Sequence, residues 1–379
     1  KRMSKYDALK YWAKTKARIS HHCHQCGAVI LKGEFYYREK VDSVHSPRLA
    51  LGELCLKCGE GKNSSSVIQS TACDSESVGT SIKIIFGDAQ NMKELPDKSV
   101  QLVVTSPPYF NAPFDYPDLF EGYAQFLQVM RNIAKELKRV LDEGRIAALV
   151  TDDTLINGHK YPVVADIIKL FVDEGFRYRD RITWVKPEGY IRISRRSGVM
   201  LQHPYPMYYY PDNIQESILI FQNGDFDYKR IPKEVKEKSR VDLRQFQDGK
   251  WYQSVWYITN VLPINNRLEK GVAAFPAEIP YRLINLFSYQ GETVLDPFMG
   301  SGTTLKVAVE LDRNAVGYEI DAELLETVKK KLNIDQLSLF KLDNKNYSII
   351  VREDVKHLRT MLQNRVEQHR GRRISENNR

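Results

Sequence analysis

The stretch of sequence that decides the fold is Glu292-Thr-Val-Leu-Asp296-Pro-Phe-Met-Gly300-Ser-Gly302-Thr-Thr304. Its pattern predicts a short buried strand that ends at Asp296, a tight turn at the glycines and a helix that starts at Thr303. Because glycine puts no side chain in the turn, backbone amides and the helix start can approach a bound ligand closely. The Lys-Ser/Thr pair of a phosphate-binding NTPase loop is absent after the last glycine, so we do not expect that class of protein.

A further strand, at residues 315–318, ends at Glu319, which lies nineteen residues after Gly300. This acid is placed like the carboxylate that binds ribose hydroxyls in nucleoside-binding folds. A glycine turn alone is weak evidence, because it can be only a tight bend. The turn and the acid together favour a nucleoside-binding site.

Short apolar runs alternate with longer amphipathic segments from residue 82 onward. We expect buried parallel strands at residues 82–86 and 100–105, which end in the loops Gly87-Asp88 and Ser106-Pro107-Pro108-Tyr109. Helices are expected at 122–141 and 163–172, each followed by a strand, at 145–150 and at 178–185. This alternation predicts an α/β fold with a mostly parallel sheet.

Four of the five cysteines form two Cys-x-x-Cys pairs, made of Cys23, Cys26, Cys55 and Cys58. Two such pairs can present four thiolates tetrahedrally to a structural Zn²⁺ ion, so we expect a zinc-binding module at residues 1–62. A disulfide framework is the alternative, but it belongs to oxidising compartments. Neither a secretory signal nor an apolar run of the ~20 residues that cross a bilayer is visible, so we expect a cytoplasmic protein.

Composition separates the remaining parts of the chain. The Ser-rich residues 63–81 indicate a flexible linker to an α/β domain at 82–340, and residues 341–379 form a basic extension. The basic excess behind the net charge of +8 lies in the two ends of the chain. Such ends suit a phosphate backbone, and a solvated charged surface is the alternative.

Two motifs of this chain resemble those of a known enzyme family. Thr105-Ser-Pro-Pro-Tyr109 resembles the catalytic motif of amino-methyltransferases that act on DNA, and Asp296-Pro-Phe-Met-Gly-Ser-Gly-Thr-Thr304 resembles their S-adenosylmethionine motif. The catalytic motif comes first, as in the circularly permuted group called beta. The resemblance covers residues 82–334 and implies a Rossmann-like methyltransferase fold with a permuted central sheet. The zinc module and the basic extension lie outside it.

The resemblance also implies the ligands and the cofactor site. S-adenosyl-L-methionine would be the cofactor, double-stranded DNA the substrate, and a cognate restriction endonuclease a candidate partner; DNA binding would place the protein at the nucleoid. Gly87-Asp88 resembles the loop whose acid meets the cofactor's adenine, and Ala274-Phe-Pro-Ala-Glu278 resembles an additional cofactor-contacting segment. The cofactor-binding residues that it implies are Asp88, Ala89, Phe275, Pro276, Glu278, Asp296, Pro297, Phe298, Gly300, Ser301, Gly302, Thr303, Thr304, Glu319 and Ile320.

The chemistry of an exocyclic amine explains the catalytic motif. Such an amine is a poor nucleophile, because its lone pair is delocalised into the ring of the base. The Ser106 side-chain oxygen and the Pro107 carbonyl could accept its two N–H groups and direct the lone pair at the methyl donor. Pro108 fixes the turn, and Tyr109 offers a face on which a flipped base can stack. The alternative interpretation of these four residues is a rigid loop.

Residues 186–270 are the expected target-recognition insertion, since they are rich in Arg and Lys interleaved with tyrosines. Basic side chains can bind phosphates or read guanine edges, and aromatic rings can stack on bases. Charged helices and tyrosine-rich packing are the alternative. The candidate DNA contacts are Arg192, Arg195, Arg196, Lys229 and Arg230.

Position 106 bears on the target base. In the family that the motifs resemble, Ser before Pro-Pro-Tyr is usual in cytosine-N4 enzymes, whereas adenine-N6 enzymes usually carry Asp or Asn. Ser106 therefore favours cytosine N4 over adenine N6. An RNA methyltransferase and a catalytically silent nucleic-acid-binding module remain as alternatives, although no motif position is visibly lost.

Overall fold

The computed structural model describes residues 79–111, 119–156, 158–186, 197–259, 275–334 and 346–358, and the backbone of five short strands near the amino terminus. The chain divides into two units, Lys1–Glu76 and Ser77–Arg379. In the first unit, β1 (Lys10–Lys16), β4 (Phe35–Val41) and β5 (Glu53–Cys55) form an antiparallel sheet, and β2 (His21–His22) pairs with β3 (Val29–Ile30). The predicted zinc ligation by Cys23, Cys26, Cys55 and Cys58 and most of the predicted linker lie outside the described residues.

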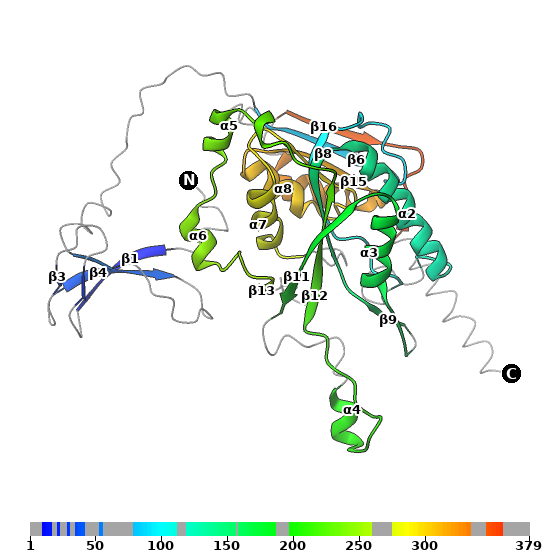
Figure 1. The fold of residues 1–379 in the computed structure, drawn as a ribbon, viewed down its shortest axis with the longest axis horizontal. Helices are drawn as coiled ribbons and strands as arrows, with labels where there is room; N and C mark the ends of the chain where they lie inside the picture. Colours follow the sequence, from blue (N-terminus) through cyan, green and yellow to red (C-terminus); the bar gives the residue numbers. More distant parts are fainter. Residues whose placement is uncertain are drawn as a thin grey trace. The chain divides into compact units, whose positions relative to one another are not determined.

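A nine-stranded mixed sheet forms the centre of the second unit (Figure 1). Its strands, in spatial order, are β13 (Val255–Tyr257), β11 (Arg177–Val185), β12 (Gln215–Asn223), β8 (Leu141–Thr151), β7 (Val100–Thr105), β14 (Thr293–Asp296), β15 (Asn314–Glu319), β6 (Ser81–Phe86) and β16 (Asn346–Val351). Strand β12 runs antiparallel to both of its neighbours, and the other neighbouring strands are parallel. The expectation of a mostly parallel sheet is confirmed.

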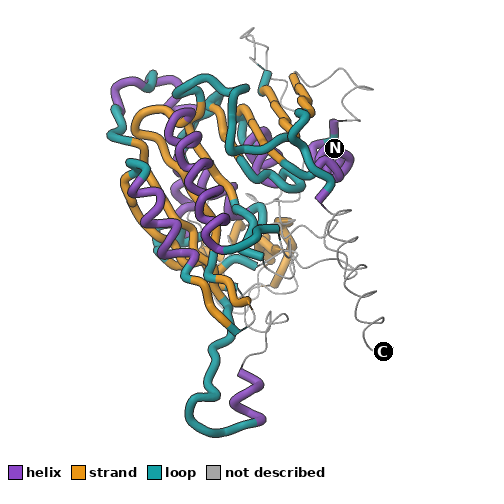
Figure 2. The backbone as a smooth tube through the Cα atoms, turned by 90° about the vertical axis from the view of Figure 1, so that its right-hand side faces the viewer, coloured by secondary structure: helices purple, strands orange, loops and turns teal. Residues whose placement is uncertain are grey.

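Helices cover both faces of this sheet (Figure 2). The side chains of the strands alternate between two hydrophobic cores, one on each face. The helices α2 (Tyr123–Val140) and α3 (Val163–Asp173) cover one face, and α7 (Glu278–Phe287), α8 (Thr303–Glu310) and α9 (Leu325–Leu332) cover the other. Helix α2 buries Phe126, Met130, Ile133 and Leu137, which recur at helical spacing and form one apolar stripe. The sheet is therefore the middle of three layers.

Shorter elements connect these layers. They are β9 (Thr154–Ile156), β10 (His159–Tyr161), α4 (Ser197–Gln202), α5 (Lys233–Lys238), α6 (Leu243–Asp248) and the 3₁₀ turns η1 (Tyr228–Arg230) and η3 (Ala322–Leu324). None of the helices in the described ranges is long and apolar enough to span a bilayer.

The structure differs from the sequence interpretation at two boundaries. Strand β16 pairs in parallel with β6, so the expected basic extension from residue 341 contains a strand of the sheet. The expected insertion at 186–270 contains two more, β12 and β13. Both boundaries were predicted from the distribution of charged residues. The strands are indicated instead by apolar runs such as Tyr347-Ser-Ile-Ile-Val351.

Close packing of α8 on β15 generates a first prediction. A Cβ atom on Gly317 would lie 2.5 Å from the Met299 sulfur and 2.9 Å from a Leu305 methyl carbon. Gly317→Ala should therefore lower the free energy of unfolding in urea by about 1–3 kcal/mol, since the helix must shift. Gly122→Ser is the control, because a Cβ atom there meets nothing within 4 Å and serine suits the N-cap position that Gly122 occupies in α2. Equal stability of the two variants would contradict this account of the packing.

Candidate active site

A cavity of about 240 Å³ opens where the parallel strands β6, β7, β14 and β15 end. The loops that leave carboxyl ends of parallel strands converge at one edge of a sheet, so motifs far apart in the sequence meet there. The predicted site residues that line this cavity are Asp88, Ala89, Ser106, Pro107, Pro108, Tyr109, Phe275, Asp296, Pro297, Phe298, Gly300, Ser301, Thr303, Thr304, Glu319 and Ile320.

Three predicted cofactor residues do not line the cavity, namely Pro276, Glu278 and Gly302. Glu278 lies in the first turn of α7 and forms an ion pair with Arg282 at 2.9 Å. Gly302 precedes α8 in the left-handed region, with φ of 89°, and donates its N–H to the Met299 carbonyl at 2.7 Å. Its conformation shapes the turn and needs glycine there.

Sequence reasoning missed part of the cavity wall. The missed residues include Gln90, Leu119, Phe120, Gln125, Val129, Met130, Ile133, Met299, Lys356 and Leu358. Those of α2 gave no signal, because their helical spacing is the same as that of ordinary core residues. Lys356 and Leu358 follow β16, in the part of the chain that its charge assigns to a separate extension.

The end of β7 is tied to the end of β14 by a buried hydrogen bond. The Thr105 hydroxyl donates to Asp296 Oδ1 at 2.6 Å, and the Phe298 backbone N–H donates to the same oxygen at 3.0 Å. Burial raises the pKa of Asp296 to about 6, against the opposing effect of these donors. The carboxyl group thus fixes the start of the glycine turn beside the Ser106 loop.

Glu319 links the glycine turn to the next loop. Its Oε2 accepts from the Gly300 N–H and its Oε1 from the Asp321 N–H, each at 2.9 Å, while its carbonyl accepts from the Gly87 N–H at 2.8 Å. Burial raises the pKa of Glu319 to about 7. A buried carboxylate on a cavity wall is suited to bind hydroxyl donors or a cation.

The hydroxyl of Tyr109 is held by residues of β12 and of the loop after β11, which lie beyond β8 in the sheet. Its hydroxyl donates to Glu216 Oε2 at 2.5 Å, and Lys186 Nζ lies 2.5 Å from Glu216 Oε1. Glu216 belongs to β12, and Lys186 follows β11. This network orients the ring of Tyr109, and no sequence pattern connects residues so far apart.

Two of the five predicted DNA contacts, Lys229 and Arg230, lie in the part of the chain that the structure describes, and neither lines the cavity. Lys229 and Arg230 lie in η1, after the end of β12, and Arg230 lies 3.7 Å from Asp142 at the start of β8. Because β12 is antiparallel to β8, its end lies at the sheet edge opposite the cavity. Arg192, Arg195 and Arg196 lie outside the described residues.

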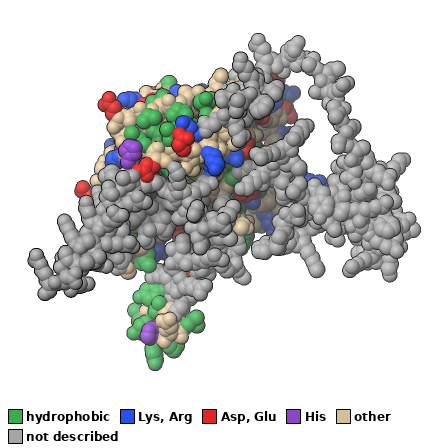
Figure 3. Space-filling model, turned by 180° about the vertical axis from the view of Figure 1, so that it is seen from behind, with side chains coloured by type: hydrophobic (Ala, Val, Ile, Leu, Met, Phe, Trp, Pro, Cys, Tyr) green, Lys and Arg blue, Asp and Glu red, His purple; other side chains and the backbone are tan. Residues whose placement is uncertain are grey.

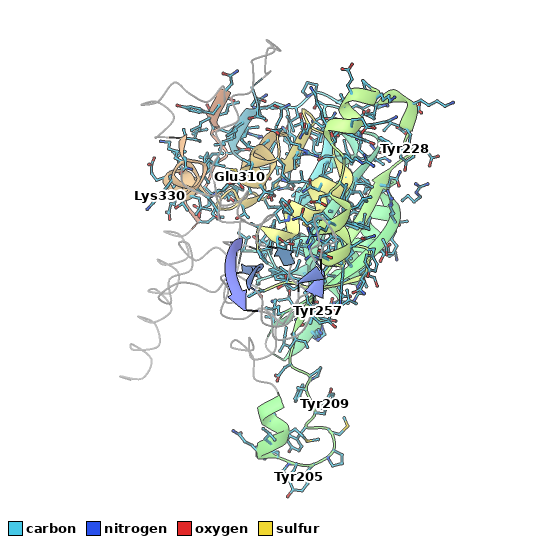
Figure 4. All side chains as sticks on the ribbon, turned by 90° about the vertical axis from the view of Figure 1, so that its left-hand side faces the viewer. Tyr205, Tyr209, Tyr228, Tyr257, Glu310 and Lys330 are labelled. Carbon is cyan, nitrogen blue, oxygen red and sulfur yellow. The ribbon has the colours of Figure 1, made fainter. Side chains whose placement is uncertain are left out.

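The start of β12, in contrast, lies at the sheet edge that carries the cavity. Figure 4 shows Tyr205 and Tyr209 at one end of the unit and Tyr228 at the other. Helix α4 and the residues after it form a projection on which hydrophobic side chains gather, as seen from behind in Figure 3. Leu201 and Met207 of this projection are 85% and 91% exposed, which is unusual for large apolar side chains.

Comparison with known proteins places this site in context. Residues 100–330 match the sequence profile of the N6/N4 methyltransferase family, described as DNA methylase. The Type II methyltransferase M.MjaI of Methanocaldococcus jannaschii is 35% identical over 290 residues, which cover 68% of this chain and 93% of M.MjaI. The Type II methyltransferase M.MthZI of Methanothermobacter thermautotrophicus is 30% identical over 286 residues, which cover 67% of this chain and 77% of M.MthZI.

A solved structure is similar as well. TTHA0409 of Thermus thermophilus, assigned to the DNA modification methylases and crystallised with S-adenosyl-L-methionine, aligns with a TM-score of 0.54 and 26% identity. The alignment covers 71% of this chain and 99% of TTHA0409. The mixed, mostly parallel sheet with helices on both faces is thus a methyltransferase fold.

Glu319 should make the free energy of unfolding fall as the pH rises. Its pKa of about 7 lies above the ordinary value of 4.5, so its contribution to stability is complete below about pH 4.5. That contribution is lost as the pH rises through about 7, and the loss should amount to roughly 1–3 kcal/mol.

Urea unfolding of three proteins at about pH 5 and about pH 8 measures this effect. Glu319→Gln carries no titrating group at this position, so its unfolding free energy should fall less with pH than that of the wild type. Glu237→Gln, at an exposed position of α5, should follow the wild type. The same pH dependence in all three proteins would refute the assignment.

Proposed function

Because this chain belongs to the N6/N4 family of DNA methylases, we propose that it transfers a methyl group from S-adenosylmethionine to N4 of cytosine in double-stranded DNA. The chain is an S-adenosylmethionine-dependent DNA methyltransferase, and the choice of base is our proposal. The observation that carries the proposal is the meeting of Ser106, Pro107 and Tyr109 with Asp296 and Glu319 around one cavity.

The residues around the cavity fit an adenosine cofactor. Glu319 is 8% exposed and lies beside the glycine turn, where its carboxylate can accept hydrogen bonds from ribose hydroxyls. Asp88 lies at the end of β6 and is suited to the adenine edge, while Phe275 and Ile320 supply apolar contact. Asp296 keeps the turn in place through Thr105. The cofactor supplies an electrophilic methyl group on a cationic sulfur.

The catalytic loop would orient the target amine. Ser106 Oγ and the Pro107 carbonyl can accept its two N–H groups, which leaves the nitrogen lone pair free to face the methyl group. Pro108 limits the loop to one conformation, and the ring of Tyr109 stacks on the flipped base. Glu216 holds the Tyr109 hydroxyl at 2.5 Å, so the ring is oriented before the base arrives.

The choice of cytosine rests on Ser106. A serine side chain is shorter than the Asp or Asn that adenine-N6 enzymes of this family usually carry. Its hydroxyl is also a neutral acceptor, unlike the carboxylate of Asp. A base must therefore approach closer or at a different tilt, which a smaller pyrimidine ring can do. Adenine N6 is the competing target.

Nucleoside mass spectrometry tests the base assignment. Purified protein, S-adenosylmethionine and unmethylated DNA of mixed sequence should yield N4-methylcytosine. Ser106→Ala should lower turnover roughly 10²-fold, because an acceptor aimed at the reacting amine is lost, and should leave cofactor affinity nearly unchanged. Ser99→Ala, whose hydroxyl bonds the Pro96 carbonyl away from the cavity, is the control.

The other products separate the alternatives. N6-methyladenine without N4-methylcytosine would overturn the base assignment and leave the family standing. Methylation of RNA but not of DNA would overturn the proposed substrate. Absence of any methylated nucleoside with both substrates would indicate a silent nucleic-acid-binding module.

Double-stranded DNA should approach the sheet edge that carries the cavity. We retain Arg192, Arg195 and Arg196 as proposed contacts, since they precede α4 in the sequence. Lys229 and Arg230 lie at the other edge and can contact only DNA that extends around the domain. Because M.MjaI and M.MthZI are named Type II methyltransferases, a restriction endonuclease of the same specificity is the proposed partner.

For the amino-terminal part we propose a zinc module at residues 1–62, joined by a linker at 63–81. The spacing of Cys23, Cys26, Cys55 and Cys58 supports it, and the basic residues of the module would help to hold DNA.

Elemental analysis tests the zinc proposal directly. Protein purified without chelator should contain one zinc per chain, and Cys26→Ser should lose it because three thiolates remain. Cys73→Ser, which changes the one cysteine outside the two pairs, should keep the metal. Metal-free wild-type protein, or equal zinc content in both variants, would contradict the proposal.

A further inference from the structure

We propose that residues 346–358, here called the C-terminal strap, complete the S-adenosylmethionine site, with Arg352 as a positioning residue for the loop that carries Asp88. The inference rests on the proposed function only in the identity of the ligand. The strap lies beyond residue 330, where the match to the family profile ends. It begins with β16, and its last residues, Lys356 and Leu358, line the cavity.

Arg352, which directly follows the edge strand β16, binds the loop after β6. Its Nη1 donates to the Asn91 carbonyl at 2.6 Å and lies 3.4 Å from the Asp88 carbonyl. Its Nη2 donates to Asp354 Oδ2 at 2.5 Å, and that same carboxylate oxygen lies 3.4 Å from the Asp88 backbone N–H. The guanidinium group thus donates to two carbonyls of the loop and to Asp354, the acid that faces the Asp88 amide.

The arrangement of charge suits a fixed arginine. Its side chain is 10% exposed, and the carboxylate of Glu94 lies 3.7 Å from Nη1, while Asp354 contacts Nη2. A guanidinium group offers several donors in a rigid planar fork, whereas a lysine ammonium cannot reach the same acceptors together. The side chain also lies against the backbone, since a Cβ atom on Gly87 would come within 2.4 Å of Arg352 Cδ.

Through its own backbone, the strap also holds the loop that follows Glu319. The Lys356 N–H donates to the Ile320 carbonyl at 2.8 Å, and the Lys356 carbonyl accepts from the Ala322 N–H at 2.9 Å. Between these two bonds lies Asp321, whose own N–H donates to Glu319 Oε1. The two acids assigned to the adenine and the ribose are therefore both positioned by one short segment.

This geometry assigns the strap to the adenosine end of the cofactor. Leu358 is 5% exposed and supplies an apolar wall there. The catalytic loop is held instead from β12 and the end of β11, through the bond from Tyr109 to Glu216 and the pairing of Glu216 with Lys186. A change in the strap should consequently alter cofactor affinity and leave the methyl-transfer step intact once the cofactor is bound.

Calorimetric titration with S-adenosylmethionine and with S-adenosylhomocysteine tests the inference. Arg352→Lys should raise the Kd of both ligands about tenfold, which is about 1.4 kcal/mol, since the fork to the loop is lost. Asp354→Asn should raise both several-fold. In methylation assays the KM for S-adenosylmethionine should rise in parallel, with kcat at saturating cofactor and the Kd for DNA within about twofold of wild type.

Glu353→Gln is the matched control, because it changes an exposed acid between the two tested positions. It should bind both ligands as the wild type does. Kd values unchanged in both Arg352→Lys and Asp354→Asn would overturn the inference, as would a fall in kcat without a change in KM. Should Arg352→Lys fail to fold, Asp354→Asn decides alone. A wild type that binds neither ligand would instead refute the proposed function.

Discussion

The hydrogen bond from Thr105 to Asp296 is the constraint on which the active site depends. It joins strands β7 and β14 at their carboxyl ends, directly before the Ser106 loop and directly before the glycine turn. The bond is buried, so breaking it would leave the Thr105 hydroxyl without its acceptor and would remove one of the donors to Asp296. The distance between the Ser106 loop and the glycine turn is therefore fixed. Methyl transfer from a bound cofactor to a bound base requires such a fixed distance.

The elements whose signals are local could be predicted from the sequence. An apolar run that stops at Ser106, and glycines directly before Thr303, indicated the end of β7 and the start of α8 correctly. Pairings between distant segments carry no comparable signal. Glu216 meets Tyr109, and Arg352 meets the Asp88 loop, only because of the strand order. The position of Lys229 at the sheet edge opposite the cavity could not be predicted either, since the composition of residues 186–270 does not reveal the direction of β12.

Acidity and ligand charge are linked in this cavity. Burial raises the pKa of both Asp296 and Glu319, so part of the carboxyl population is protonated near neutral pH. A cationic ligand favours the ionised forms and should lower both pKa values. Binding of the charged donor then releases protons, whereas loss of the methyl group removes the positive charge and weakens this favourable interaction. The neutral product should consequently be held less firmly by the same acids.

The position of β6 in the sheet has a consequence for biosynthesis. Its two neighbours, β15 and β16, are among the last elements of this unit to be translated. While the segment between β6 and β15 is being synthesised, the apolar β6 has neither of its partners in the sheet, and the high contact order of these pairings favours slow maturation. Incomplete chains on ribosomes would lack the strap and with it a finished cofactor site.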